Sequence, residues 1–153
     1  MKIGVLSDTH NVYDRKIIRL FAGVDHILHA GDIGLPWIIL ELEQIAPVTA
    51  VLGNNDHGLD VPPLAVRELG SRKFLIHQIV NPHAPAPTLR QQLFRHSPEV
   101  VVFGHTHKTF AGVIGQTLFF NPGSAGLARF GIERSVGLLH CDETGVRPEF
   151  LAL

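Results

Sequence analysis

The first half of the chain contains short apolar runs that each end in a cluster of polar residues and glycine. The runs are Ile3–Leu6, Ile27–Leu28 and Val48–Leu52, and apolar residues at helical spacing fill the two segments between them, 14–22 and 36–45. Short apolar runs bounded by turn-forming residues are typical of buried strands. The order strand, helix, strand, helix, strand therefore predicts a parallel sheet.

The second half changes to short strands joined by turns that contain glycine. The predicted elements are strands at 64–69, 73–76, 100–103, 109–114, 117–120, 135–140 and 146–151, a proline-rich loop at 81–87 and a helix at 88–95. We expect the late strands to form an antiparallel meander. Because no linker or repeat divides the chain, we predict a single domain over residues 1–153. Its expected fold is α/β (α+β), with two stacked mixed β-sheets flanked by helices.

The composition of the chain argues against several classes of protein. The chain has 153 residues, of which 45% are hydrophobic and 18% charged, so it can bury a core and is not expected to be disordered. A formal net charge of -1 supplies no field that would attract nucleic acid or anionic lipid. No apolar run approaches the ~20 residues that span a bilayer, and we expect no secretory leader. The lone Cys141 fits a reducing compartment, so we predict a cytoplasmic protein.

Five polar clusters follow apolar runs at the point where each run ends. They are Asp8-Thr9-His10, Gly31-Asp32, Gly53-Asn54-Asn55-Asp56, His77 and Gly104-His105-Thr106-His107. Functional sites of open α/β sheets form at the edge where strands end. Carboxylate, imidazole and amide groups gathered there would suit manganese, iron, zinc or nickel better than calcium. Taken singly, the carboxylates could be helix caps and the Gly53-Asn54 pair a turn, so the ordered set carries the prediction.

This ordered set resembles the motifs of the calcineurin-like metallophosphoesterases, and of their compact single-domain bacterial and archaeal members in particular. The family order is D-x-H, G-D, G-N-x-D, a lone His and G-H-x-H, and all five motifs occur here. The resemblance continues through Asn121-Pro122-Gly123-Ser124, which matches the turn after the late hairpin of the family. It implies the family's sandwich of two sheets over nearly the whole chain.

The resemblance also implies a set of metal ligands. Asp8, His10, Asp32 and His107 would hold one cation, and Asp32, Asn54, His77 and His105 the other, so that Asp32 bridges them. The cofactors implied are two divalent transition-metal ions, with manganese favoured and iron, zinc, nickel or cobalt as alternatives. A shared carboxylate can hold two cations about 3.5–4 Å apart, and a water between them becomes a hydroxide near neutral pH. That hydroxide would attack phosphorus in line.

The function predicted in this way is a binuclear-metal-dependent phosphohydrolase, with phosphodiesters favoured over phosphomonoesters as the small phosphate-ester substrate. The alternative is a non-catalytic protein of the same fold. A eukaryotic retromer subunit is similar in fold yet works mainly through protein surfaces, and a metal-storage or metal-sensing protein would bind ions without turnover. The complete ligand set favours the enzyme over the scaffold, whereas only turnover would separate the enzyme from a metal-storage or metal-sensing protein.

Several residues near the motifs leave questions open. Asn55 stands where many phosphatases of the superfamily have a histidine that assists departure of the leaving group, and His57 is our candidate to replace it. Asp56 is expected to orient the metal or a ligand histidine, with a helix-cap or turn role as the alternative. Gln78 stands where glycine is common and leaves the width of the pocket undetermined. The sequence assigns no role to the 81–87 loop. Arg129 lies where the family often has an arginine, and a structural role is preferred for it.

One apolar stretch is wider than a core-facing stripe requires. In Leu35-Pro36-Trp37-Ile38-Ile39-Leu40, apolar residues occupy more of the helix than one face. This pattern predicts either full burial inside the domain or a contact between subunits of a homo-oligomer.

Overall fold

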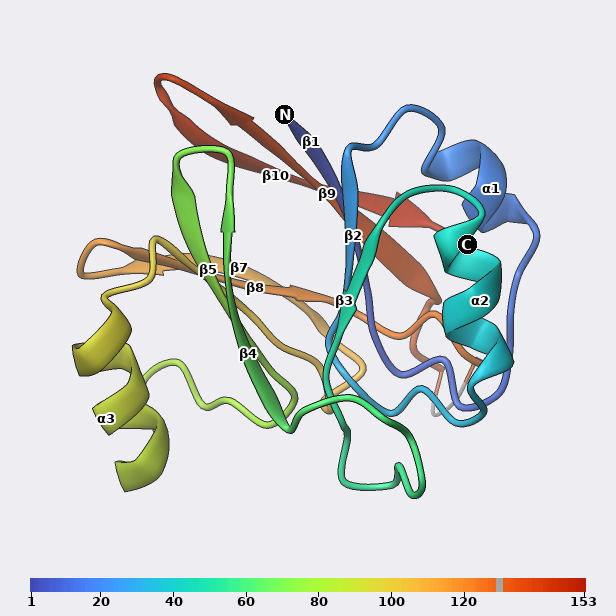
Figure 1. Cartoon of the computed structure of the whole chain (residues 1–153), viewed down its shortest axis with the longest axis horizontal. Coiled ribbons are helices and arrows are strands. Elements are labelled where there is room, and N and C mark those ends of the chain that lie inside the picture. The colour runs from blue at the N-terminus through green and yellow to red at the C-terminus, as the bar shows by residue number, and fades with distance from the viewer. Residues whose placement is uncertain (129–130) are drawn as a thin grey trace.

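The computed structural model describes residues 1–128 and 131–153, so Arg129 lies outside the described residues. Ten strands and three helices are present in the described part. Their bounds are β1 Lys2–Leu6, α1 Lys16–Leu20, β2 His26–His29, α2 Trp37–Glu43, β3 Val48–Ala50, β4 Leu64–Leu69, β5 Arg72–His77, α3 Pro87–His96, β6 Val100–Val102, β7 Thr109–Ile114, β8 Thr117–Pro122, β9 Ser135–Asp142 and β10 Gly145–Ala152. The predicted fold class of two mixed sheets flanked by helices is confirmed (Figure 1).

The first sheet has the order β10-β9-β1-β2-β3. Its strands β1, β2 and β3 pair in parallel, as the alternation of strands and helices predicts. Parallel neighbours need a crossover between them, and the crossovers contain α1 and α2. Strands β9 and β10 form a hairpin, and β9 pairs with β1 in antiparallel register.

The second sheet has the order β4-β5-β6-β8-β7. The expected continuous meander of late strands is wrong, because the hairpin β7–β8 joins this sheet whereas the hairpin β9–β10 joins the other one. Strand β8 pairs in parallel with β6. On its other side β8 pairs in antiparallel register with β7, which forms the edge of the sheet. This arrangement leaves β5, β6 and β8 parallel, so β5 and β6 both deliver their last residues to one edge of the sheet.

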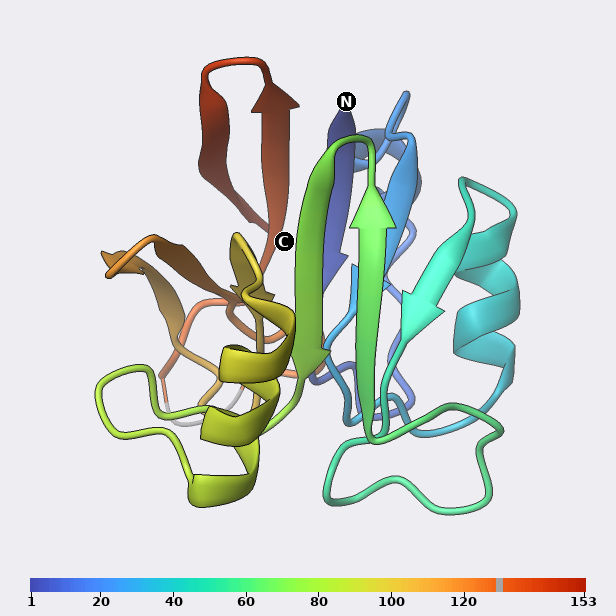
Figure 2. The same ribbon diagram turned by 60° about the vertical axis from the view of Figure 1, so that its left-hand side comes forward.

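Three apolar clusters hold the layers together. The central cluster contains residues of both sheets, including Val5 and Leu28 from the first and Phe74 and Phe120 from the second. A second cluster packs α1 and α2 on the outer face of the first sheet, and a third packs α3 on the outer face of the second. The helices therefore lie on opposite outer sides of the stacked sheets, as Figures 1 and 2 show.

Helix α1 differs from its predicted range, and helix α2 differs from full burial inside the domain, which was one of its two predicted alternatives. α1 is shorter than the predicted 14–22 because the chain tightens after Leu20, where the N–H of Ala22 donates to the carbonyl of Arg19 three residues back. α2 is not fully buried, since the exposed fractions of Leu35, Trp37 and Leu40 are 53%, 41% and 59%. Among the described residues, no helix reaches the length and hydropathy that a membrane crossing requires.

Candidate metal centre

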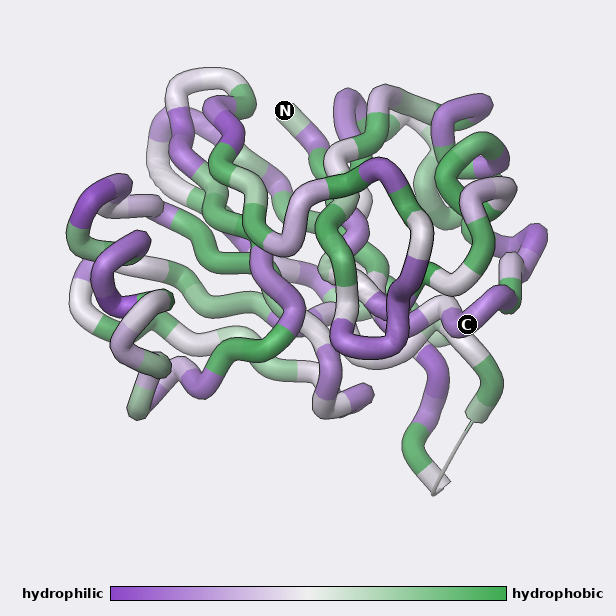
Figure 3. Tube along the Cα trace, turned by 60° about the horizontal axis from the view of Figure 1, so that its bottom comes forward, coloured by the Kyte–Doolittle hydropathy of each residue, from purple (hydrophilic) through white to green (hydrophobic). Residues whose placement is uncertain are grey.

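The polar clusters meet at one edge of the stacked sheets. Strands β1, β2 and β3 end there in parallel, and β5 and β6 end there in the second sheet. Figure 3 turns this edge toward the viewer and shows hydrophilic stretches among its loops. The two sheets are joined at this point, because the backbone N–H of His105 donates to Oδ2 of Asp8 at 3.0 Å.

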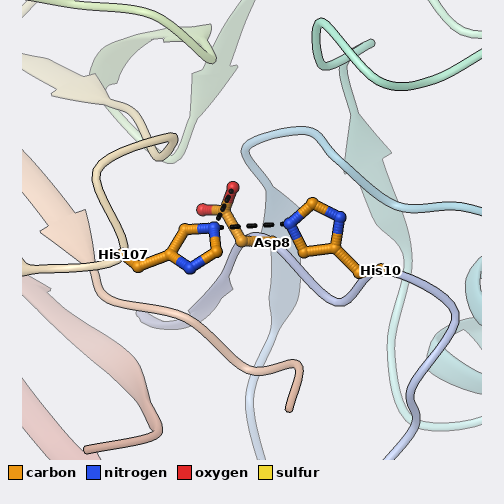
Figure 4. Close-up of side chains that lie close together, drawn as sticks. All are labelled: Asp8, His10 and His107. Atoms are coloured by element: carbon orange, nitrogen blue, oxygen red, sulfur yellow. Dashed lines mark hydrogen bonds and ion pairs between the residues drawn. The ribbon is translucent and has the colours of Figure 1, made fainter. Parts of the chain in front are cut away.

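Three of the predicted ligands lie together. Asp8, His10 and His107 each offer a ligand atom within 4.8 Å of the others, and no other His, Cys, Asp or Glu cluster of this kind occurs among the described residues. Figure 4 shows the two imidazoles facing each other beside the carboxylate. The Nε2 atoms of His10 and His107 are 3.3 Å apart, and Nε2 of His107 is 3.4 Å from Oδ1 of Asp8.

Asp32 lies at the side of this triad. Its Oδ2 is 3.7 Å from Nε2 of His10. Asn55 holds the carboxylate from the other side, with its backbone N–H donating to Oδ1 at 2.9 Å and its side-chain Nδ2 donating to Oδ2 at 2.7 Å. Partial burial raises the pKa of Asp32, but the hydrogen bonds from Asn55, together with Gln78 and the nearby His10, leave the pKa below its ordinary value. Asp32 is therefore held as an oriented carboxylate.

The remaining predicted ligands are brought together only in part. Nδ1 of His105 lies 3.1 Å from Oδ1 of Asn54, so these two residues face each other. Nδ1 of His77 donates to the carbonyl of Pro63 at 2.8 Å, which fixes the ring orientation. In the residues that the structure describes, no hydrogen bond or ion pair joins His77 to another predicted ligand.

Backbone strain is concentrated in the same motifs. In the described chain seven residues other than glycine have a positive φ, and six of them belong to the site or adjoin it: Asp8, His10, Asn11, Asp32, His105 and His107, with φ between 44° and 69°. A left-handed backbone costs an ordinary residue roughly 1–2 kcal/mol. Such strain persists where the surrounding structure imposes it, and it clusters at functional sites. Asn11 takes this conformation as its residue type allows.

Asp56 and His57 differ sharply in their surroundings. The buried carboxylate of Asp56 accepts the backbone N–H groups of Ile33, Gly34 and Gly53 at 3.1, 2.8 and 2.8 Å. It thereby ties the loop after β2 to the loop after β3, which corresponds to the turn alternative of the prediction. His57 is exposed on the same loop.

The donor set at this edge fits a transition-metal ion. Imidazole nitrogens combined with carboxylate oxygens are the ligands that such ions prefer. Asp8 is fully buried, and burial raises the pKa of its carboxyl although the nearby His107 opposes this effect. A cation among these side chains would supply the charge that a buried carboxylate requires. Beside them, His10, Asn11, Gly34, Asn55 and Asp56 line a cavity of about 390 Å³ that can admit a ligand.

A buried histidine supports the site from within the sheet. His29 is fully buried; its Nδ1 accepts the N–H of Gly31 at 3.2 Å, so its Nε2 donates to Oγ1 of Thr9 at 3.0 Å. Oγ1 of Thr9 in turn donates to the carbonyl of Ile33 at 2.9 Å. These bonds satisfy a neutral ring. Desolvation lowers the pKa of His29 from 6.5 to about 4, and the charges of Asp56 and Asp32 only partly oppose it.

The low pKa of His29 predicts a pH dependence of stability. Between pH 6.5 and about 4, the unfolded chain binds a proton at this ring and the folded chain does not, so the free energy of unfolding falls as the pH falls through this window. A shift of this size corresponds to roughly 3 kcal/mol. Urea denaturation of metal-free protein at pH 7.5 and 4.5 measures the loss. His29→Gln has no titratable ring at this position, so its free energy of unfolding should fall by about that much less than the free energy of the wild type. An equal fall in both proteins would contradict the assignment.

Two residues that support the site, Asn121 and Gln78, had no clear signal in the sequence. Asn121 is fully buried at the end of β8, and its Nδ2 donates to the carbonyl of Gly104 at 2.9 Å and to Oγ1 of Thr106 at 3.1 Å. It therefore supports the loop that carries His105 and His107. Its place in the Asn121-Pro122-Gly123-Ser124 turn was the one available hint. Gln78, noted in the sequence only as an unusual residue, contacts the predicted ligands Asp8 and Asn54 directly.

The sequence model described as the calcineurin-like phosphoesterase superfamily domain matches residues 1–144. A probable metallophosphoesterase of Methanothermobacter thermautotrophicus is 38% identical over 151 residues, with 93% of this chain and 87% of the relative covered. The phosphodiesterase MJ0936 of Methanocaldococcus jannaschii is 28% identical over 142 residues, with 80% and 83% covered.

Solved structures show the same likeness. A structure described as a novel archaeal phosphodiesterase superposes with a TM-score of 0.82 and 26% identity, and all of both chains is covered. Vps29 of Entamoeba histolytica, in a complex with Zn²⁺, superposes with a TM-score of 0.76 at 21% identity, and 99% of both chains is covered. At that identity the likeness to Vps29 shows the fold alone.

Proposed function

Because the chain belongs to the calcineurin-like phosphoesterase superfamily, we propose that it is a metal-dependent phosphohydrolase that acts on phosphodiesters in preference to phosphomonoesters. The observation that carries the proposal is the convergence of Asp8, His10 and His107 beside Asp32 at the edge where both sheets end. Relatives that bear the name phosphodiesterase support the preference for diesters. Turnover of a panel of phosphomonoesters and phosphodiesters by protein of known metal content tests it.

The residues of this chain would divide the work of holding the ions. Asp8, His10 and His107 with Asp32 would ligate one divalent cation, and Asp32, Asn54, His77 and His105 the other. When bound, two such cations supply a nucleophile at neutral pH and stabilise charge on the phosphoryl oxygens. Asn55 orients the shared carboxylate through its two hydrogen bonds. Manganese is the proposed ion, with iron, zinc, nickel or cobalt as alternatives.

A protein-binding scaffold is the second candidate function. The exposed apolar side chains of Leu35, Trp37 and Leu40 favour it, because apolar surface of this kind often marks a protein contact. The assembled triad of Asp8, His10 and His107 favours catalysis, since a scaffold needs no strained ligand loops. We therefore propose that the apolar surface serves a homo-oligomer of a catalytic protein.

We further propose that residues 1–153 work as one catalytic domain in the cytoplasm, where the buried thiol of Cys141 would stay reduced.

The residue at position 55 predicts which leaving groups the enzyme accepts. The backbone N–H and the side-chain amide of Asn55 both donate to Asp32, and a neutral amide cannot protonate a departing oxygen near neutral pH. General-acid help is worth roughly 10²–10⁴-fold when the leaving group is poor. We therefore expect rapid hydrolysis of aryl diesters such as bis(p-nitrophenyl) phosphate and slow hydrolysis of alkyl diesters. The measurement is kcat/KM for both substrate classes.

Variants separate the contribution of His57 from that of Asn55. If His57 supplies the proton, His57→Ala should lower the ratio of alkyl to aryl kcat/KM, and Asn55→His should raise it. His96→Ala, at the end of α3, is the matched control and should leave the ratio unchanged. Equal losses for both substrate classes in His57→Ala would remove His57 from this role, and a wild-type preference for alkyl monoesters would contradict the leaving-group argument.

A further inference from the structure

Gln78 is a buried polar residue at the centre of the proposed metal site. It follows His77 directly after the end of β5, and 1% of its surface is exposed. The sequence offered no role for it, since glycine is common at this position of the family. A buried amide requires partners for both of its ends, and the partners of Gln78 are informative.

Each end of the Gln78 side chain contacts a different proposed ligand. Nε2 donates to Oδ1 of Asp8 at 3.1 Å, and Oε1 accepts the backbone N–H of Asn54 at 2.7 Å. The backbone carbonyl of Gln78 also accepts the N–H of Gly104, which precedes His105, at 3.0 Å. One residue directly after a strand of the second sheet therefore links the loops after β1, β3 and β6.

The surroundings of Gln78 are shaped to receive this side chain. A Cβ atom at Gly31 would lie 3.0 Å from Cβ of Gln78, and a Cβ atom at Gly53 would lie 2.2 Å from its Oε1. Two motif glycines thus leave the space that the amide occupies. The chemistry is equally specific, because a donor is required toward Asp8 and an acceptor toward Asn54. A carboxylate lacks the donor, and an apolar side chain lacks both groups.

We propose that Gln78 is a positioning residue that orients Asp8 of one cation site and Asn54 of the other, and so sets the affinity of both sites for divalent metal. This inference rests on the proposed function only for the identity of the ligands. Residues behind metal ligands hold those ligands in the conformation that binds, and their loss typically lowers metal affinity by about 10–100-fold. Because Gln78 reaches both ligands, its loss should weaken both binding events.

The test is direct titration of metal-free protein with Mn²⁺ by isothermal calorimetry, which needs no enzyme activity. Gln78→Met keeps the length and approximate volume of the side chain and removes both hydrogen-bonding groups. We expect the wild-type chain to bind two Mn²⁺ and Gln78→Met to bind them roughly 10–100-fold more weakly. Gln116→Met, in the exposed turn between β7 and β8, is the matched control and should bind as the wild type does.

A purely structural role would give a different result. Gln78→Met would then unfold at lower denaturant concentration without metal, while the folded protein bound Mn²⁺ with wild-type Kd, and that outcome would overturn the proposal. If Gln78→Met does not fold, Gln78→Gly takes its place with the same expectation, and wild-type affinity in that variant would also overturn it. A wild-type chain that binds two Mn²⁺ but hydrolyses no phosphate ester would contradict the proposed function and leave the Gln78 test intact.

Discussion

Asp32→Ala is expected to lower phosphodiester turnover by at least about 10³-fold, because the two cations that would stabilise the transition state lose their shared ligand. A terminal ligand serves one cation, so His107→Ala should cost less. The structure places the Asp32 carboxylate 3.7 Å from His10 and fixes both of its oxygens through Asn55. Two oriented oxygens, each with a lone pair beyond its hydrogen bond, are suited to two ions.

Steady-state kinetics and metal analysis on the same preparation check this expectation. Asp60→Ala, which removes an exposed carboxylate from the loop after β3, is the matched control and should retain turnover and metal. If Asp32→Ala kept two ions per chain and the wild-type rate, Asp32 could not be the bridging ligand.

Gly53→Ala is expected to have the second-largest effect. A Cβ atom at this position would lie 2.0 Å from Oδ1 of Asp32 and 2.2 Å from Oε1 of Gln78. Contacts this short force the carboxylate and the amide to move, and a misplacement of about 1 Å in a catalytic arrangement can cost about 10²-fold in rate. Overpacking also lowers the free energy of unfolding by roughly 1–3 kcal/mol. The glycine of the G-N motif is therefore required by the side chains packed against it.

Gly115→Ala is a control for general strain. Gly115 has a φ of 64° and nothing within 4 Å of its missing Cβ, so alanine there adds backbone strain far from the site. Both variants should unfold at lower denaturant concentration, but Gly53→Ala alone should lose Mn²⁺ affinity and turnover. Wild-type metal affinity in Gly53→Ala would show that the loop accommodates a methyl group without moving Asp32.

The parallel core of the fold could be predicted from the sequence, because its signals are local. Apolar runs such as Val48–Leu52 end in turn residues, and the helices between them have their own periodicity. The pairing of β8 with β6 could not be predicted, since it depends on contacts between segments far apart in the chain. The expected meander assumed that neighbouring strands pair, and the chain instead sends its last hairpin to the other sheet.

The site shows the same division between local and distant signals. Motif order identified Asp8, His10 and His107, which the structure brings together. The roles of Asn55 and Gln78 depend on which side-chain groups they meet across the two sheets, and residue types alone do not specify such contacts. Whether the apolar face of α2 is buried or exposed could not be predicted for a related reason, because periodicity reveals apolar faces and not what covers them.

The central claim is that divalent metal held by these residues is required for phosphodiester hydrolysis. The most direct test strips the metal with a chelator, verifies its absence, and measures turnover of bis(p-nitrophenyl) phosphate before and after addition of Mn²⁺. We expect no turnover by the metal-free protein and full recovery as the Mn²⁺ content approaches two ions per chain. Undiminished hydrolysis by verified metal-free protein would contradict the claim.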